Sequence, residues 1–516
     1  MSAIGRAERG ARSASQRSGP DVVLTGVAVL SIFGAILAGM IAGQAPILAV
    51  AAASALFLGT AIVLRPDVAT LTTIAILYSN AAVVAVRFHD VPVFVAAIVP
   101  MLLAVPLARD LVVRRLPVVA PPMLGWMVAL LFIHLVSALF SVDKTTAWDS
   151  VTVFLVEGFG LYFLLINVIR TPEMLRSVTW ILLAAGAFVS LLSVHQDLTS
   201  NYGNDYFGFA QTSDAAFSTG VTTLTGTVVQ PRLAGSIGET NRFAQVMLML
   251  VPLGIFRFMS EPSRWLRILA GLMTTVITLG VVLTFSRGAA VGLGLLLIAL
   301  VALRMVQRQH IVAIGLALVL VFVSFPQYWT RVSSLAAVGS LAQGGGTGAV
   351  DNSLLSRATE TLSAALVMVD HPLIGVGPGM FPTYYEEYAK IVGIRIKNDA
   401  TREAHNLYLG IGAELGVTGL VVFLIIAFLT VRMILIARRR SIDRRPDLER
   451  LTTPFALSIL TYHATGMFLH LSFARFYWLM LAVAGAAAVI TLREMDATDT
   501  ADATAPRSQG AYSQSV

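Results

Sequence analysis

One histidine and three arginines stand where polar segments of the chain meet apolar ones. His405 lies in "REAHNLYLGIGAELG" just before a long apolar run, and Arg287 lies in "LTFSRGAAVGLG" between two apolar runs. Arg357 belongs to "NSLLSRATETLSAAL" and Arg232 to "VQPRLAGSIGETNRFA". A histidine with an ordinary pKa of about 6.5 accepts protons at neutral pH. Arginines bind phosphate bidentately. Together these side chains could hold a phosphate or pyrophosphate and deprotonate a hydroxyl.

Each of these residues also has a simpler interpretation. His405 could be an interfacial histidine that is hydrogen-bonded to a neighbour. Arg287 could anchor a short turn to lipid headgroups, although Ser286 before it is able to cap a helix whose N-terminus attracts anions. Arg357 and Arg232 could be ordinary solvated charges. The four positions are therefore candidates for a functional site. Whether they form one depends on where the surrounding helices and loops place them.

The segment after His405 has a glycine pattern. If a helix begins at His405, then Tyr408, Gly412, Gly416 and Gly419 lie on approximately the same face. Small residues let another helix pack closely. We therefore expect this face, with the histidine, to point into a helix bundle, with Tyr408 lining the same cavity.

Five further residues are weaker candidates. Arg242 reads as a charge at a helix start and is a possible lining residue of the cavity around His405. His470 and Arg475 flank the last predicted outer turn and could line the same cavity as His405. Glu157 lies within an apolar run, where we expect a hydrogen-bonded structural role, although an intramembrane acid can relay protons. Glu414 is expected to be structural.

Composition indicates an all-α polytopic membrane protein. The chain has 516 residues, of which 56% are hydrophobic and 13% charged, and its mean hydropathy is +0.79. Its apolar runs are continuous, which is typical of helices. The basic balance fits cytosolic loops of a membrane protein rather than nucleic-acid binding. With no cysteine and no DxD or DxH motif, neither a metal nor another cofactor is expected.

The apolar windows predict about 12–14 transmembrane helices. They lie near residues 22–42, 45–64, 68–86, 91–108, 121–140, 151–169, 177–195, 242–259, 266–285, 289–303, 311–325, 405–436, 455–471 and 475–492. With the N-terminus in the cytosol, 24 of the 36 lysines and arginines fall on the cytosolic side. The positive-inside rule therefore predicts that both termini are cytosolic and that the four candidates face the other side.

This topology divides the chain into seven parts. Both long loops are expected outside and to contain short helices. In the second, an amphipathic helix is expected on the membrane surface through Leu355, Ala358, Leu362, Ala365, Leu366 and Val369, ended by His371–Pro372. The parts are a basic cytosolic tail (1–20), N-terminal transmembrane helices (21–195), a first long loop (196–241), central transmembrane helices (242–325), a second long loop (326–404), C-terminal transmembrane helices (405–492) and a disordered cytosolic tail (493–516).

Taken in order, five segments resemble the O-antigen ligase and Wzy-type polymerase family. They are "GETNRFAQVMLMLVP", "TFSRGAAVGLG", "LLSRATETLSAAL", "HPLIGVGPGMF" and "EAHNLYLGIGAELGVTGL", within roughly residues 230–425. The resemblance implies a metal-independent GT-C glycosyltransferase of the bacterial inner membrane. Such an enzyme joins a glycan from undecaprenyl pyrophosphate to an acceptor hydroxyl on the periplasmic face. It also implies that Arg287 and Arg357 bind the donor pyrophosphate, with Arg232 as a looser match, and that His405 is the catalytic base.

The partners implied are the lipid-linked donor, an acceptor glycan or lipid A core, the bilayer, a chain-length regulator and a flippase. A direct displacement would invert the anomeric carbon. Polymerase and ligase are not separated by the residues, and the long chain favours a polymerase. A transporter or flippase of lipid-linked sugars is the rival from another class, for which charged residues and broken helices are expected at the membrane midplane.

Overall fold

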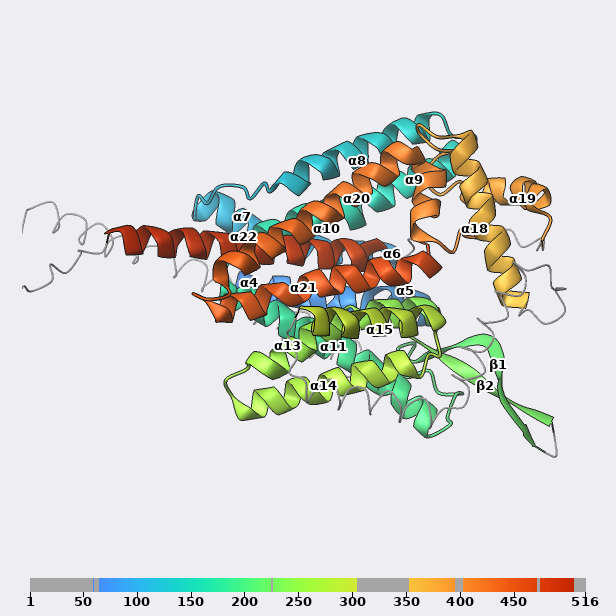
Figure 1. The fold of residues 1–516 in the computed structure, drawn as a ribbon, viewed down its shortest axis with the longest axis horizontal. Helices are drawn as coiled ribbons and strands as arrows, with labels where there is room; N and C mark the ends of the chain where they lie inside the picture. Colours follow the sequence, from blue (N-terminus) through green and yellow to red (C-terminus); the bar gives the residue numbers. More distant parts are fainter. Residues whose placement is uncertain are drawn as a thin grey trace, which may run out of the picture.

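The protein is a bundle of α-helices with a β-hairpin at one end (Figure 1). The computed structural model describes residues 59, 65–223, 226–303, 352–394, 402–470 and 474–504. In chain order the elements are α4 (Pro66–Tyr78), α5 (Ala81–His89), α6 (Val93–Ile98), η1 (Val99–Leu103), α7 (Ala104–Ala108), η2 (Arg109–Val113), α8 (Pro122–Leu139), α9 (Lys144–Val153), η3 (Phe154–Gly160), α10 (Leu161–Val168), α11 (Pro172–Leu198), β1 (Gln211–Thr223), β2 (Gly226–Gly235), α12 (Thr240–Leu248), α13 (Leu250–Ser260), α14 (Arg264–Val282), α15 (Arg287–Ala302), α18 (Asn352–Asp370), α19 (Phe381–Val392), α20 (Leu407–Ser441), α21 (Pro446–Thr465), η5 (Gly466–Phe468) and α22 (Ala474–Thr504).

Eight helical segments among the described residues are long and apolar enough to cross a membrane. A ninth is counted if α4 and α5, which are bent by 57°, form one broken span. These helices confirm the predicted all-α polytopic membrane protein. The windows 22–42 and 311–325, and 45–64 apart from Gly59, lie outside the described residues. The total of 12–14 spans therefore stays a prediction.

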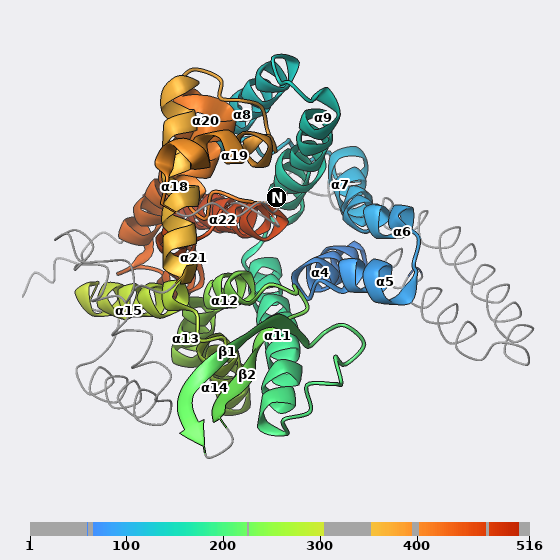
Figure 2. The ribbon, with the colours of Figure 1, turned by 90° about the vertical axis from the view of Figure 1, so that its right-hand side faces the viewer.

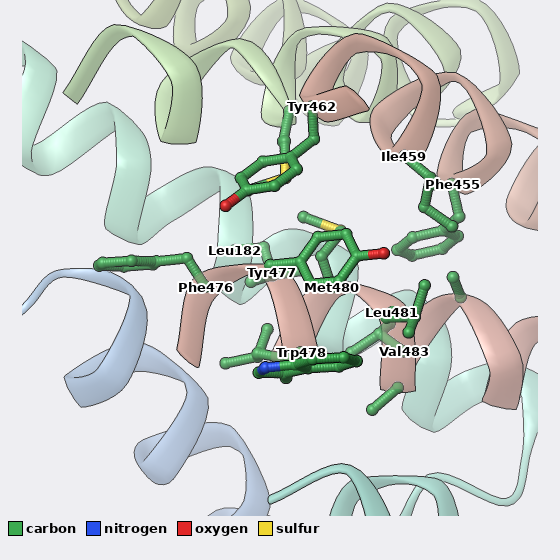
Figure 3. Close-up of a cluster of buried hydrophobic side chains, with 14 of the residues drawn as sticks. Leu182, Phe455, Ile459, Tyr462, Phe476, Tyr477, Trp478, Met480, Leu481 and Val483 are labelled. Carbon is green, nitrogen blue, oxygen red and sulfur yellow. The ribbon is translucent and has the colours of Figure 1, made fainter. Parts of the chain in front are cut away.

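Helix α22 forms the centre of the bundle. Its first turns are apolar on every side, and a helix of that kind is stable only when neighbours cover it all round. Tyr477 stacks on Tyr462 of α21 with ring centroids 4.8 Å apart, and Trp478 lies in the same buried cluster (Figure 3). This packed core therefore fixes the first turns of α22.

Helix α20 is broken at Gly416, which has φ 71° and ψ −179°. The turn at residues 371–379 fills the break, and its Gly377 N–H donates 3.0 Å to the carbonyl of Glu414. A Cβ at Gly416 would lie 2.5 Å from the backbone of Leu373. The expectation that Gly416 continues a smooth helix face is therefore wrong. Because a break inside a membrane needs internal hydrogen-bond partners, the glycine-rich turn is what makes it stable.

The first long loop contains a β-hairpin in place of the expected short helices. Strands β1 and β2 are antiparallel, with Gln211 opposite Gly235 and Thr223 opposite Gly226. The threonine-rich sequence favours this outcome, because β-branched side chains fit extended strands better than helices. The hairpin leads directly into α12 and so positions Arg232 and Arg242.

The second long loop contains the expected short helices, α18 and α19. Helix α18 ends at Asp370, just before His371–Pro372, as predicted. It runs across the end of the bundle from the start of α20 toward α15 (Figure 2). We call this end, which holds α18, α19 and the hairpin, the loop end. The end at which α20 and α22 finish is the opposite end (Figure 1).

Candidate active site

His405 lies in the residue before a helix cap, not on the helix. Helix α20 begins at Leu407, and the side chain of Asn406 caps it by accepting N–H bonds of 3.0 Å each from Tyr408 and Leu409. His405 itself has a left-handed φ of 46°. The predicted helical face shared by His405 and Tyr408 is therefore wrong. The cap turns the chain sharply, so the imidazole leaves the axis of α20 and faces α18.

The imidazole of His405 faces a buried carboxylate. Its Nε2 lies 3.5 Å from Oε2 of Glu360 on α18, and the other oxygen of Glu360 accepts a hydrogen bond of 3.3 Å from Arg402. Glu360 is 1% exposed. The Nδ1 atom of His405 is buried and has no hydrogen-bond partner among the described residues. One ring nitrogen thus lies beside a carboxylate, and the other is buried without a hydrogen-bond partner among the described residues.

Helix α18 turns its polar face into the site. Its inward positions recur at helical spacing as Ser356, Thr359, Glu360 and Ser363, each less than 5% exposed. Leu362 and Val369, which were expected to lie on a membrane surface, are exposed at 47% and 67%. The amphipathic helix on the membrane surface stays a prediction, and these two side chains are left uncovered by the described residues. A helix with buried polar side chains needs partners for them, and here those partners lie around His405.

Three arginines surround His405 electrostatically. Burial, together with the positive charges of Arg357, Arg242 and Arg402, lowers the pKa of His405 from 6.5 to about 3. Burial and Arg242 also hold the pKa of His470 well below its usual value. Both imidazoles are therefore neutral at physiological pH. An environment of this kind is poised to receive negative charge.

Arg242 lies in the first turn of α12, as predicted, and is buried there. It is fully buried, donates 3.0 Å to Oε1 of Gln245 and donates to the carbonyl of His470. Its Nε lies 3.5 Å from Oε2 of Glu239. The ring of His470 lies 5.7 Å from that of His405, edge to face. Arg242 therefore links α12 to the segment that carries the second histidine.

Arg232 holds the turn in which Arg287 lies. Its Nε donates 2.9 Å to the carbonyl of Thr284, and its Nη2 donates 3.2 Å to Asn241. Ser286 caps α15 by accepting a bond of 3.4 Å from the N–H of Ala289, as predicted. Arg287 is thus the first residue of a capped helix, on a turn that Arg232 fixes.

The turn of Arg287 lies against the segment of His470. A Cβ on Gly288 would lie 3.3 Å from the side chain of Phe468. Arg287 therefore starts its helix beside the segment that ends in His470, and Arg242 binds that same segment from α12. The structure brings together, at the loop end, elements that are far apart in the sequence.

Two predicted cavity residues are engaged elsewhere. Tyr408 donates 2.8 Å to the carbonyl of His463. Arg475 donates to Asn80 and lies 3.2 Å from Oε1 of Glu157. Glu157 thus has the ion-paired environment of a structural acid. The contacts of Tyr408 and Arg475 tie helices together rather than extend the site of His405.

Sequence reasoning missed three residues beside the histidine. Glu360 lies beside its imidazole, Arg402 binds Glu360, and Asn406 caps the helix that follows. In the sequence, these three residues have no distinguishing feature except that they lie in the same segments as Arg357 and His405. A useful signal was present in "LLSRATETLS", where polar residues recur at helical spacing on one face. Among the described residues, no group of histidines and acids could hold a metal ion.

A model of a known protein family matches the stretch of sequence that contains part of this site. Residues 270–424 match the family model of the O-antigen ligases. The matched region contains Arg287, Arg357, Glu360, Arg402 and His405. Arg232 and Arg242 precede it. No curated protein matches the chain.

Proposed function

We propose that this chain, whose residues 270–424 belong to the O-antigen ligase family, is a membrane glycosyltransferase that takes a glycan from undecaprenyl pyrophosphate. The acceptor is a hydroxyl on a second glycan, and the product is a polymer of O-antigen or exopolysaccharide repeat units. The observation that carries the proposal is the buried His405–Glu360 pair inside a group of arginines. That arrangement supplies a base beside a site for a doubly charged leaving group.

The arginines bind the leaving group in this mechanism. When the bond between the anomeric carbon and the phosphate oxygen breaks, negative charge grows on the pyrophosphate. Arg287 at the capped N-terminus of α15 and Arg357 on α18 stabilise that charge, because fixed positive groups act strongly in a poorly hydrated site. Arg242 and Arg402 add to the same field. Arg232 contributes indirectly, through the turn that it holds.

His405 removes the proton from the acceptor hydroxyl. The free Nδ1 takes the proton as the hydroxyl oxygen attacks the anomeric carbon. The imidazolium that forms has its Nε2–H directed to Glu360, which stabilises the positive charge. A single displacement of this kind inverts the anomeric carbon, and the proton remains on the histidine until the product leaves.

Donor binding strengthens the base. In the donor-free site burial and the charges of the arginines hold the pKa of His405 at about 3, so the imidazole is neutral but weakly basic. A bound pyrophosphate offsets the positive charges and raises the pKa of His405. The histidine therefore becomes a stronger base when the donor is present.

Topology and the location of the arginines favour this function over transport. The proposed active site faces the periplasm of the bacterial inner membrane, since the basic loops predicted from the sequence lie on the other side. A transporter places its charged site near the midplane between half-helices. Here the buried arginines with His405 lie at the loop end. A ligase that uses lipid A core as acceptor is the alternative within the family.

The glycan profile of a deletion strain tests the proposal. A polymerase predicts the loss of long chains, with single repeat units still attached to the acceptor. A ligase predicts the loss of all attached glycan. An unchanged surface glycan in the deletion strain, with the lipid-linked intermediates at their normal level, contradicts both.

A further inference from the structure

A cavity of about 390 Å³ adjoins the site. Residues from α8, α9, η3, α20 and α22 line it, together with the 371–379 turn and the segment before His405. Its size lies within the roughly 300–1,000 Å³ of small-molecule sites. His470 lines it, and the ring of His470 lies 5.7 Å from that of His405. The cavity therefore leads toward the proposed base.

The segment 402–405 lies between the arginine group and the cavity. Arg402 and His405 both lie beside Glu360. Glu403 lines the cavity and lies 3.9 Å from Nε2 of His470. Burial raises the pKa of Glu403 above its usual value, and the positive charge of Arg242 opposes that rise. The arginine group therefore adjoins the cavity at Glu403 and His470.

The lining of the cavity combines carboxylates with aromatic rings. Its carboxylates come from Asp149, Glu403 and Glu414, and among the described residues no lysine or arginine lines it. The backbone N–H groups of Gly379 and Phe381 donate to the carboxylate of Glu414. Phe423 and Trp478 supply aromatic rings.

Trp478 belongs to the aromatic part of this lining. Its side chain is 1% exposed, and its indole N–H is buried with no hydrogen-bond partner among the described residues. The rings of Trp478 and Phe423 give the cavity apolar faces. Carboxylates that accept from hydroxyls, together with aromatic faces, make up a suitable lining for a sugar ring.

We infer that this cavity is the acceptor subsite, and that it takes a neutral or amino sugar and rejects one that carries a carboxylate or phosphate. The role of the cavity as acceptor subsite rests on the proposed function, whereas its sugar preference rests on the lining alone. Like charges in the lining repel an acidic sugar, whereas hydroxyls and an ammonium group bind carboxylates. The acceptor thus reaches His405 from a cavity lined by carboxylates.

Sugar binding without donor tests the inference. The full chain in nanodiscs is mixed in turn with methyl glucoside, methyl glucosaminide and methyl glucuronide, and binding is measured by saturation-transfer NMR. We expect the first two to bind and the glucuronide to bind about fivefold more weakly, the effect of one like charge near a solvated surface. Asp149→Lys should reverse that order. Glu387→Lys, an exposed acid of α19 outside the cavity, should not.

A cavity-filling pair separates this inference from the proposed function. Val153→Trp, at a partly exposed lining position, should abolish sugar binding, whereas Thr152→Trp next to it, which does not line the cavity, should preserve it. Equal binding of the three sugars, or binding that survives Val153→Trp, overturns the inference. Transfer from the lipid-linked donor with an unchanged acceptor KM in Val153→Trp rejects the subsite and leaves the glycosyltransferase standing. Selective sugar binding by a protein that shows no transfer supports the sugar preference of the cavity and rejects the glycosyltransferase.

Discussion

The two ends of the bundle use arginine differently. At the opposite end, Arg440 is 35% exposed in its side chain and pairs with Asp499 at 2.6 Å and Asp496 at 2.8 Å. At the loop end, Arg242 is fully buried, and Arg402 is 19% exposed and shares the carboxylate of Glu360 with His405. The difference lies in burial and in what the charge faces. Arginines at the opposite end face water and acids, and arginines at the loop end face a histidine.

Under the proposed function, this contrast separates charges that set topology from charges that do chemistry. Arginines with exposed acidic partners are screened by solvent, and each pair contributes little to stability. Arginines that depress the pKa of a neighbouring histidine concentrate positive charge. The proposed donor pyrophosphate would neutralise that charge.

The largest effect is expected for the arginines of the donor site. Arg357→Ala and Arg287→Ala should each lower the transfer rate by about 10²–10³-fold, since each removes one stabilising group for the leaving pyrophosphate. The lysine variants should recover part of that loss, because lysine keeps the charge but lacks the bidentate fork. The rates are measured with purified protein and a lipid-linked donor. Full activity in an alanine variant removes that arginine from the site.

A smaller effect is expected for the carboxylate behind the base. Glu360→Gln should slow transfer about tenfold, the effect of about one pKa unit on the imidazolium. Glu360→Gln also removes the carboxylate partner of Arg402. The control is therefore the double variant Glu360→Gln with Arg402→Gln, in which transfer should be no slower than in Glu360→Gln alone. Donor binding, measured separately, should be unchanged or tighter. Unaltered turnover in Glu360→Gln means that His405 needs no carboxylate.

The pH profile follows from the charge of the arginines. Since the pKa of His405 is about 3 in the donor-free site, kcat/KM should stay level from pH 8 down to pH 5.5. Arg357→Ala removes the largest electrostatic contribution to that depression, so the pKa of His405 rises. An acid limb should then appear in kcat/KM, because protonated histidine is no base. A profile that this variant leaves unchanged contradicts the electrostatic coupling.

The smallest effect is expected at the opposite end. Arg440→Ala breaks exposed ion pairs with Asp496 and Asp499, so the transfer rate should equal that of wild type. The measurement uses the same assay as the donor-site variants, with membrane expression as the control. A large loss of transfer in well-expressed Arg440→Ala would show that the two ends are not functionally separate.

Sequence reasoning located membrane helices but did not predict the helix break and the long-range contacts around His405. Continuous apolar runs determine where helices cross, and α8, α11 and α14 lie close to their predicted windows. The break of α20 was missed because Gly416 also fits a helix-packing pattern. Only the contact between Gly416 and the distant 371–379 turn distinguishes a helix break from a helix-packing glycine.

The candidate site was predicted in its residue types more than in its geometry. His405, Arg287 and Arg357 were recognised, but Glu360 was not, because the burial of α18's polar face depends on elements 40 or more residues away in the chain. Arg242 was underrated for the same reason, since its contact with the carbonyl of His470 joins residues 228 apart. Long-range packing, rather than local pattern, brings these groups together.

The central claim is that His405 is the base for glycosyl transfer and not a structural histidine. Its most direct test is to purify His405→Ala in nanodiscs, measure donor binding, and follow a single turnover from a lipid-linked donor with acceptor present. The account predicts unimpaired donor binding with transfer slowed by about 10²–10⁴-fold. Transfer at the wild-type rate from pH 5.5 to 8 would contradict it, and the base would then be sought first at His470.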